Sequence, residues 1–454
     1  MYLFVNTSYK KTMSEVRKVI QVEERVPLAQ GIPLSIQHLF AMFSASVLVP
    51  AIFQINPAIV LLMNGIGTLL FITITQGKAP AYLGSSFAFI SPTLLIMANP
   101  DLGYRYALGG FIISGGLFCI AAIIVKFFGT KWINVLLPPA AMGPVIALIG
   151  LELAGTAAGM GGLILDPANG YTAINPKYVA VFIITLGTAV FGSVLFRKFF
   201  AAIPVLIAII VGYIASFFLG IINFEPIKTA SMFALPNFQS PAFNLSAIMI
   251  ILPATLVVVS EHIGHQLVTG KIVGKNLIKE PGLHRTLLGD GLSTMLSGFC
   301  GSVPTTTYGE NIGVMAMTKV YSVYVIGGAG IFSICLAFIG KVAGAIQTIP
   351  TPVMGGISFL LYGMIAASGL RLLVDERVNY DRSRNLALSS VVFVTGLSGA
   401  FIQIGEVQLK GMALATIVGM VLSLIFYVID RLHLANDMEV PDGQPQTFGP
   451  ENLK

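Results

Sequence analysis

The amino-acid sequence predicts an all-α polytopic membrane protein of fourteen transmembrane segments, arranged as two inverted seven-span repeats. Hydrophobic residues make up 55% of the 454 positions and charged residues only 10%, whereas a soluble domain carries about 25% charged residues. Apolar runs recur along the whole chain, and short motifs of the first half return in the same order in the second. These three observations exclude a soluble globular protein.

The apolar runs give the expected order of helices. Most of them approach the ~20 residues that a transmembrane helix needs. The third and the tenth are short and interrupted by a β-prone run, so we expect a short β-strand and then a half-helix in each. Such backbone persists at membrane depth only where it is buried in protein or lines a cavity. The fourteen segments are 33–53, 57–75, 81–98, 105–126, 134–152, 177–196, 200–222, 245–269, 285–301, 304–318, 321–340, 351–369, 385–402 and 411–430.

The distribution of basic residues predicts the orientation. An even number of spans places both termini on one side, and Lys and Arg concentrate on the cytoplasmic side. With both ends inside, the tails 1–30 and 431–454 and the internal loops hold 21 of the 26 Lys and Arg residues. No basic patch outside these loops would support nucleic-acid binding. The external positions are Arg105, Lys177, Lys228, Lys341 and Lys410.

Four motif pairs predict an internal repeat. Their offsets are 226, 224, 218 and 212 residues, in the same order along the chain. Seven spans separate the copies, and an odd number inverts the second copy. Residues 31–222 and 245–430 should therefore form inverted repeats, with a binding site near the midplane where the broken spans meet. The pairs are 64–70 with 290–296, 77–80 with 301–304, 106–110 with 324–328, and 138–143 with 350–355.

The tenth segment places a carboxylate at a helix break. A β-prone run from Thr305 to Tyr308 leads into Gly309, and Glu310 then opens a short helical segment. An interrupted span with an ionisable residue at the break indicates a transporter binding site.

The eighth segment carries ionisable residues in the middle of an apolar helix. Glu261 and His265 are four residues apart and share a face, whereas His262 points away and can equally be a packing residue. A charge at that depth costs ~3 kcal/mol or more, so this pair should face water, bind each other or exchange a proton. A metal site is disfavoured, because the HExxH order is absent and the two histidines supply only two nitrogen ligands.

Two further carboxylates are less informative. Glu152 falls at the outer end of its predicted span, where water reaches it, so we expect a structural or peripheral role. Asp290 occupies the position of Asn64 in the repeat. For Asp290, a helix-packing role and a functional role both stay open.

The chemistry of the predicted site selects its ligand. Backbone N–H groups at Ser86, Phe87, Gly309 and Glu310 begin half-helices and lack intrahelical acceptors, whereas Glu261 and Glu310 are acceptors. A free anion would be repelled by the carboxylates, and a bare cation by the helix dipoles. A small, neutral, planar molecule with alternating N–H and C=O groups, such as a nucleobase, suits both.

These residues resemble the nucleobase/ascorbate transporter family, which includes the xanthine and uracil permeases. Residues 310–319 match its Glu/Gln-Asn-x-Gly signature, followed after four residues by Thr and a basic or small residue. Gln37-His38, 80–92 and 261–265 are also similar, and the likeness extends over roughly residues 22 to 435. The Glu at position 310, where purine-transporting relatives commonly have Gln, favours the bacterial uracil-transporting branch.

The resemblance implies a core domain of spans 1–4 and 8–11 and a gate domain of spans 5–7 and 12–14, in a bacterial cytoplasmic membrane. It implies uracil uptake with a proton, and a homodimer through the gate domain is a further expectation. Carboxylates and backbone N–H groups would bind the pyrimidine, and His265 would couple the proton to it. The implied substrate-binding residues are Phe87, Glu261, Tyr308, Gly309 and Glu310, and the proton-coupling residues are His38, Glu261 and His265.

Three other functions stay open at this point. Position 310 disfavours a purine (xanthine or urate) symporter of the same family. An anion transporter on the same inverted-repeat fold would bind its anion at the half-helix N-terminus. The carboxylate of Glu310 at that position disfavours this function. A membrane-embedded enzyme finds no nucleophile–base pair or metal cluster to support it. The sequence thus predicts a transporter without a cofactor, whose partners are uracil, a proton and membrane lipid.

Overall fold

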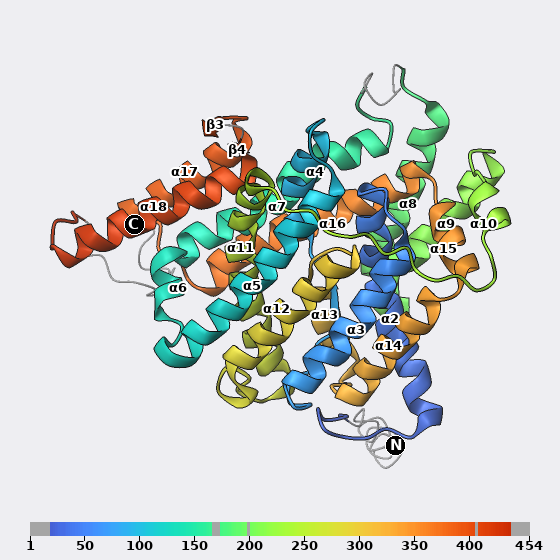
Figure 1. The fold of residues 1–454 in the computed structure, drawn as a ribbon, viewed down its shortest axis with the longest axis horizontal. Helices are drawn as coiled ribbons and strands as arrows, with labels where there is room; N and C mark the ends of the chain where they lie inside the picture. The colour runs from blue at the N-terminus through green and yellow to red at the C-terminus, as the bar shows by residue number, and fades with distance from the viewer. Residues whose placement is uncertain (1–18, 166–172, 198–199, 405–406, 437–454) are drawn as a thin grey trace, which may run out of the picture.

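The computed structural model describes residues 19–165, 173–197, 200–404 and 407–436, and these are mostly helical (Figure 1). Within that part of the chain, eight helices are long and apolar enough to cross a membrane. They are α2 (Leu28–Ile52), α3 (Pro57–Ile74), α5 (Tyr104–Phe128), α7 (Pro139–Met160), α8 (Pro176–Leu195), α11 (Leu245–Val273), α16 (Thr351–Asp375) and α18 (Gly411–Arg431).

Shorter helices occupy the remaining predicted segments. Each of the fourteen segments contains a helix, so the predicted order is confirmed, whereas the number that cross a membrane stays a prediction. These shorter helices are α4 (Ile90–Ala98), which follows the 3₁₀ turn η1 (Phe87–Phe89), and α9 (Pro204–Phe218), α12 (Leu283–Cys300), α13 (Gly309–Thr318), α14 (Val323–Ala337) and α17 (Ser383–Leu397). In the described residues, three further short α-helices lie between segments or overlap their edges: α6 (Lys131–Leu136), α10 (Glu225–Thr229) and α15 (Gly340–Gln347).

Several predicted boundaries are wrong, and two of them bear on the description of the site and the topology. The fifth segment is predicted to end at Glu152, but α7 continues to Met160 through a run rich in Ala and Gly. The thirteenth was expected to reach residue 402, but α17 ends at Leu397 and Gly399 turns the chain with a φ of +74°. The apolar residues beyond it form a hairpin instead, in which β3 (Phe401–Ile404) pairs antiparallel with β4 (Val407–Lys410).

The predicted cytoplasmic tails fall mostly outside the described residues. The described part of the N-terminal one is packed against the protein. Ile20 and Val320 form a parallel bridge, and the N–H of Val323 donates to the carbonyl of Val22 (2.9 Å). This segment therefore covers the loop after α13.

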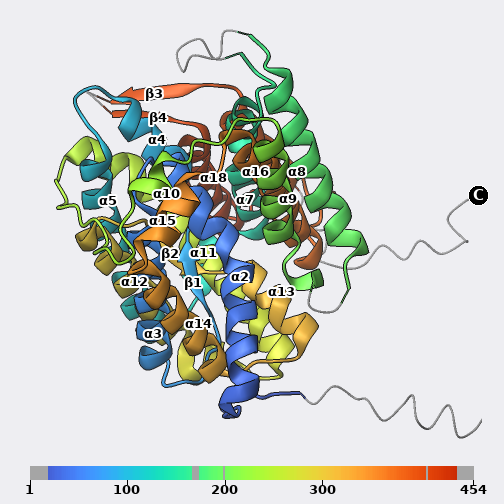
Figure 2. The same cartoon turned by 90° about the vertical axis from the view of Figure 1, so that its right-hand side faces the viewer.

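The two short strands predicted in the broken spans are confirmed. β1 (Leu83–Ser85) pairs antiparallel with β2 (Thr305–Thr307), with Gly84 opposite Thr306. Both strands are fully buried, in the interior beside α2 and α11 (Figure 2). The pairing satisfies backbone groups that would otherwise be orphaned at this depth, and it brings the two interrupted spans together.

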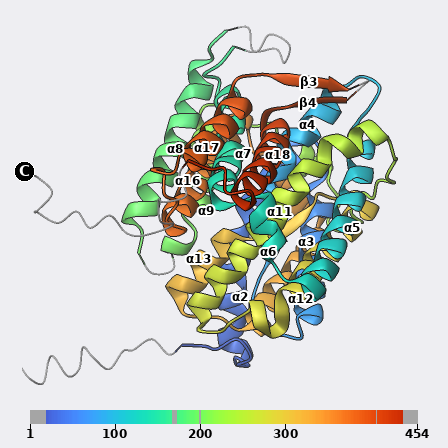
Figure 3. The same cartoon turned by 90° about the vertical axis from the view of Figure 1, so that its left-hand side faces the viewer.

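The helices pack in two groups. In the first, α12 packs against α5 and α3, while α14 packs against α3 and α2. In the second, α7 packs against α16 and α17, and α8 against α9 and α16. Figure 3 shows α7, α16, α17 and α18 gathered on one side of the molecule. Helix α11 contacts both groups, through α5 and through α18. Packing alone does not test movement, so the core and gate domains stay a prediction.

Gly84 makes the strand pair possible. A Cβ atom there would lie 2.0 Å from Cε2 of Tyr308, whose ring is fixed because its hydroxyl donates to the carbonyl of Ser85 (2.8 Å). We expect Gly84→Ala to lower the free energy of unfolding by about 1–3 kcal/mol, the usual cost of overpacking. Thermal unfolding in detergent measures this. Gly187→Ala is the control, because a Cβ at Gly187 meets nothing within 4 Å. Equal stability of the two variants would contradict the prediction.

Candidate substrate-binding site

Two half-helices begin at the strand pair. β1 leads into η1 at Phe87, and β2 leads through Tyr308 into α13 at Gly309. The first N–H groups of a helix have no intrahelical acceptor, so those at Phe87 and Gly309 face the break. The prediction for Ser86 is wrong, because its N–H donates to the carbonyl of Pro304 (2.9 Å) and extends the ladder.

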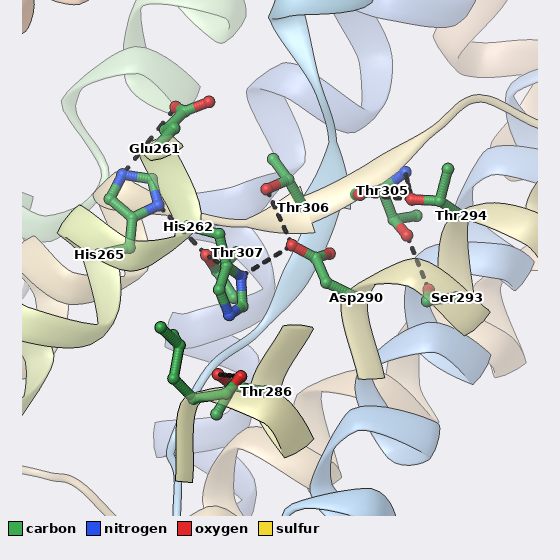
Figure 4. A network of polar contacts seen from close by, with 11 residues as sticks. Glu261, His262, His265, Thr286, Asp290, Ser293, Thr294, Thr305, Thr306 and Thr307 are labelled. Atoms are coloured by element: carbon green, nitrogen blue, oxygen red, sulfur yellow. Dashed lines mark hydrogen bonds and ion pairs between the residues drawn. The ribbon is translucent and has the colours of Figure 1, made fainter. Parts of the chain in front are cut away.

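Helix α12 holds β2 in place by polar side chains (Figure 4). Ser293 and Thr305 share a hydrogen bond between their hydroxyl oxygens (2.7 Å), and the Thr294 hydroxyl donates to the carbonyl of Thr305 (2.8 Å). The Thr306 hydroxyl donates to Oδ2 of Asp290 (3.2 Å). All five residues are buried, so the start of α13 is fixed by a network that excludes water.

Glu261 and His265 lie side by side on α11, as predicted. Oε1 of Glu261 is 4.0 Å from Nε2 of His265, and their side chains stay 26% and 21% exposed. Gly309 lies next to this pair, because a Cβ atom there would be 3.5 Å from Nε2 of His265. The N-terminus of α13 therefore meets the ionisable face of α11.

Behind this pair lies a second His–carboxylate pair that sequence reasoning did not find. Nδ1 of His262 and Oδ2 of Asp290 are 2.8 Å apart, and both side chains are 0% exposed. His262 is therefore more than a packing residue, and Asp290 has a definite partner. The sequence signal was an aspartate in mid-span, but 28 residues separate it from His262 and nothing in the pattern links the two.

Thr307 connects the two pairs. Its hydroxyl lies 3.2 Å from Nδ1 of His265 and 3.5 Å from Nδ1 of His262. A continuous polar chain thus leads from the partly exposed Glu261 to the sealed Asp290 (Figure 4). Such an arrangement can hold a proton and orient the groups that exchange it.

Aromatic rings border the break. Phe87 meets Tyr308 and Tyr362 edge-on, with ring centroids 6.3 Å apart in both pairs. Tyr308 belongs to the broken span, whereas Tyr362 comes from α16 of the other helix group. Sequence reasoning missed Tyr362, because one tyrosine in an apolar span carries no distinguishing signal. Phe87 is half-buried, so part of its ring remains accessible.

The remaining predicted residues lie around the start of α13. Glu310 is half-buried in its first turn, where the helix dipole favours a negative charge. Asn311 follows, and its amide donates to Nδ1 of His38 (2.8 Å). His38 is buried at 1% exposure and so supports the helix that carries Glu310.

Glu152 has a structural role, which is one of the two roles expected for it, but it does not lie at the end of its helix. It lies eight residues before the end of α7 and is half-buried. Its Oε1 accepts a hydrogen bond from the Ser91 hydroxyl (2.7 Å), and its Oε2 accepts one from the N–H of Met412 (3.1 Å). Only its expected place at the end of the span is wrong, because α7 is longer than the apolar run suggests.

Comparison with known proteins decides the family. A model described as a permease family, Xan_ur_permease, matches residues 29–405. The chain belongs to this permease family. The uracil permease of Escherichia coli (strain K12) is 60% identical over 416 residues, which cover 92% of this chain and 96% of that protein. The uracil permease of Paenibacillus larvae subsp. larvae is 54% identical over 420 residues, covering 92% and 99%. The predicted family is confirmed.

A solved structure shows the same fold. The transmembrane domain of the cyanobacterial bicarbonate transporter BicA is similar with a TM-score of 0.58 and 16% sequence identity, covering 90% of this permease and 99% of that chain. At this identity the likeness concerns the fold alone. Together with the apolar helices, the family makes this chain a multi-pass membrane permease and not an enzyme.

Proposed function

We propose that this permease carries uracil into a bacterial cell by proton symport. The observation that carries the proposal is the convergence of β1, β2 and α11. The start of α13 at Gly309 adjoins the face of α11 that bears Glu261 and His265, and η1, which begins at Phe87, packs against α11 as well. Relatives that are 60% and 54% identical are named uracil permeases, which supports uracil as the substrate.

Uracil matches the donors and acceptors of this site. Its carbonyl oxygens would accept from the N–H groups of Phe87 and Gly309, and its ring N–H groups would donate to Glu261 and Glu310. Hydrogen bonds to carboxylates are about twice as strong as neutral ones. The ring of Phe87, between Tyr308 and Tyr362, would pack against the pyrimidine,.

The proton would reside on the Glu261–His265 pair. Both side chains are partly exposed, so a proton can arrive by water, and their 4.0 Å separation allows a small movement to join them. His262 and Asp290 are sealed from solvent and would fix Thr307, which orients His265. His38 would act through Asn311, as a supporting residue of Glu310.

The transport cycle would involve the two helix groups as the core and gate domains. Phe87 from one group and Tyr362 from the other meet at the site, so movement of one group against the other would change the surroundings of the substrate. We further propose that both termini are cytoplasmic, on the basis of the Lys and Arg asymmetry, and that the gate domain forms a homodimer.

Uptake of radiolabelled uracil into proteoliposomes tests the proposal. With an inward-directed proton gradient, uracil should accumulate, and unlabelled xanthine should compete poorly. Uptake that ignores the gradient would refute symport. Strong competition by xanthine would favour a purine substrate instead.

His265→Ala should separate substrate binding from proton coupling. His265 faces Glu261 at 4.0 Å and bonds Thr307, so its loss removes the proton partner but leaves both carboxylates. We expect uracil binding to persist while proton-driven accumulation fails, as measured by calorimetry and by uptake with and without a pH gradient. Full gradient dependence in the variant would place the proton route elsewhere.

A further inference from the structure

Glu152 bridges the two helix groups. It belongs to α7, which packs against α16, α17 and α18. One of its oxygens accepts from the Ser91 hydroxyl of α4 at 2.7 Å, and the other accepts from the backbone N–H of Met412 in α18 at 3.1 Å. Neither hydrogen bond takes part in the binding chemistry described above.

The hydrogen bond between Met412 and Glu152 lies within the second helix group, because α7 and α18 both belong to it. Lys410 precedes α18 without a side-chain cap, so the Glu152 carboxylate serves as an acceptor for its N-terminus, where negative charge is favoured. Gly411 makes room for it: its φ is +57°, and a Cβ atom there would lie 2.0 Å from Oε1 of Glu152. The carboxylate is therefore held by α18 whatever α4 does.

The hydrogen bond between Ser91 and Glu152 connects the two helix groups. Helix α4 packs mainly against α5 and α11 and has a smaller contact with α7, and it is the half-helix that continues from Phe87 through η1. Ser91 lies four residues after Phe87, about one helical turn away. Beside this small packing contact, the Ser91 hydroxyl thus links the half-helix of the substrate site to a carboxylate on the opposite group.

We infer that Glu152 is a positioning residue for transport, which holds α4 against the α7–α18 pair in the conformer seen here. Relative movement of the two groups breaks the Ser91–Glu152 hydrogen bond and leaves the Met412 one intact. The bond therefore contributes to the equilibrium between conformers without touching the substrate. This inference rests on the proposed transport function.

The test removes the hydroxyl and keeps the carboxylate. Ser91→Ala deletes the bond, whereas Ser91→Thr retains a hydroxyl and is the matched control. In a chain whose Cys119, Cys300 and Cys335 are replaced by alanine, spin labels at the exposed positions Asp101 and Leu163 report the separation of the two groups without uracil. Uracil affinity and counterflow are measured on the same preparations.

A hydrogen bond to a charged group corresponds to a factor of about ten to a hundred in an equilibrium. Each conformer gives its own label distance, so the distance distribution reports the ratio of the two conformer populations. We expect Ser91→Ala to shift this population ratio by about ten-fold or more and to change the counterflow rate. Ser91→Thr should match the parent. Glu152→Gln should shift this ratio in the same direction but less, because its amide can still bond the Ser91 hydroxyl, though without a charge to strengthen the bond.

Two results would overturn the inference. One is a parental distance distribution in Ser91→Ala. The other is a loss of uracil affinity at an unchanged distribution, which would place Ser91 in the binding site. A chain that binds no uracil even without substitution would refute the proposed substrate instead, and the label distances, recorded without uracil, would still decide the role of Glu152.

Discussion

Glu310→Gln is expected to weaken uracil binding roughly ten- to hundred-fold, with the fold unchanged. Glu310 lies in the first turn of α13, half-buried, next to the glycine that faces His265. The amide keeps the size of the side chain but is a neutral and weaker acceptor. A hydrogen bond to a charged group contributes about 1.5–3 kcal/mol, which gives this range of affinity.

Calorimetry on the purified variant measures the effect. Glu280→Gln is the matched control, because it makes the same chemical change at an exposed residue that pairs with Lys78 (2.6 Å). Its affinity should equal that of the unsubstituted permease. Unchanged affinity in Glu310→Gln would remove this carboxylate from the proposed site, whereas an unfolded variant, detected by its thermal transition, would assign it a structural role.

Asp290→Leu is expected to destabilise the protein by about 3–5 kcal/mol, the usual effect of breaking a buried pair from one side. It leaves His262 at 0% exposure without its carboxylate, and it takes the acceptor from the Thr306 hydroxyl as well. Because Thr306 belongs to β2, we also expect weaker uracil binding. Thermal unfolding and calorimetry on the same preparation measure both effects.

A double-substitution cycle distinguishes the interaction between His262 and Asp290 from the effect of changing the volume of either side chain. With His262→Phe added, no buried imidazole is left unpaired, so the double variant should be more stable than the sum of the two single changes predicts. Additive effects would mean that the two side chains do not depend on each other. In that case the 2.8 Å contact would contribute nothing to the fold.

The architecture was predictable because the bilayer imposes strong rules on sequence. Runs of apolar residues mark helices, and a glycine after a β-prone run marks a break, so β1, β2 and the half-helices behind them were expected in place. The shared face of Glu261 and His265 followed from their spacing alone. Helical periodicity is sufficient to predict that two side chains lie close together when both are on one helix.

The parts that failed depend on contacts between distant segments. His262 and Asp290 lie on different helices, and Tyr362 reaches Phe87 from α16; no periodic pattern encodes either contact. The predicted span ends too early at Glu152, because α7 continues from there to Met160. The apolar run at Phe401 resembled the end of a span but forms β3, since Gly399 ends the helix first.

The strand pair has a consequence for how the protein is made. Thr305 follows its partner Ser85 by 220 residues, and a ribosome adds about 5–20 residues per second. β1 is therefore synthesised roughly 10–45 seconds before a partner exists, with its backbone polar groups unpaired in a membrane. During biogenesis, β1 must therefore either stay outside the hydrocarbon core until β2 is made, or form backbone hydrogen bonds with another protein. A nascent chain arrested before residue 305 should accordingly be a preferred client of the insertion machinery.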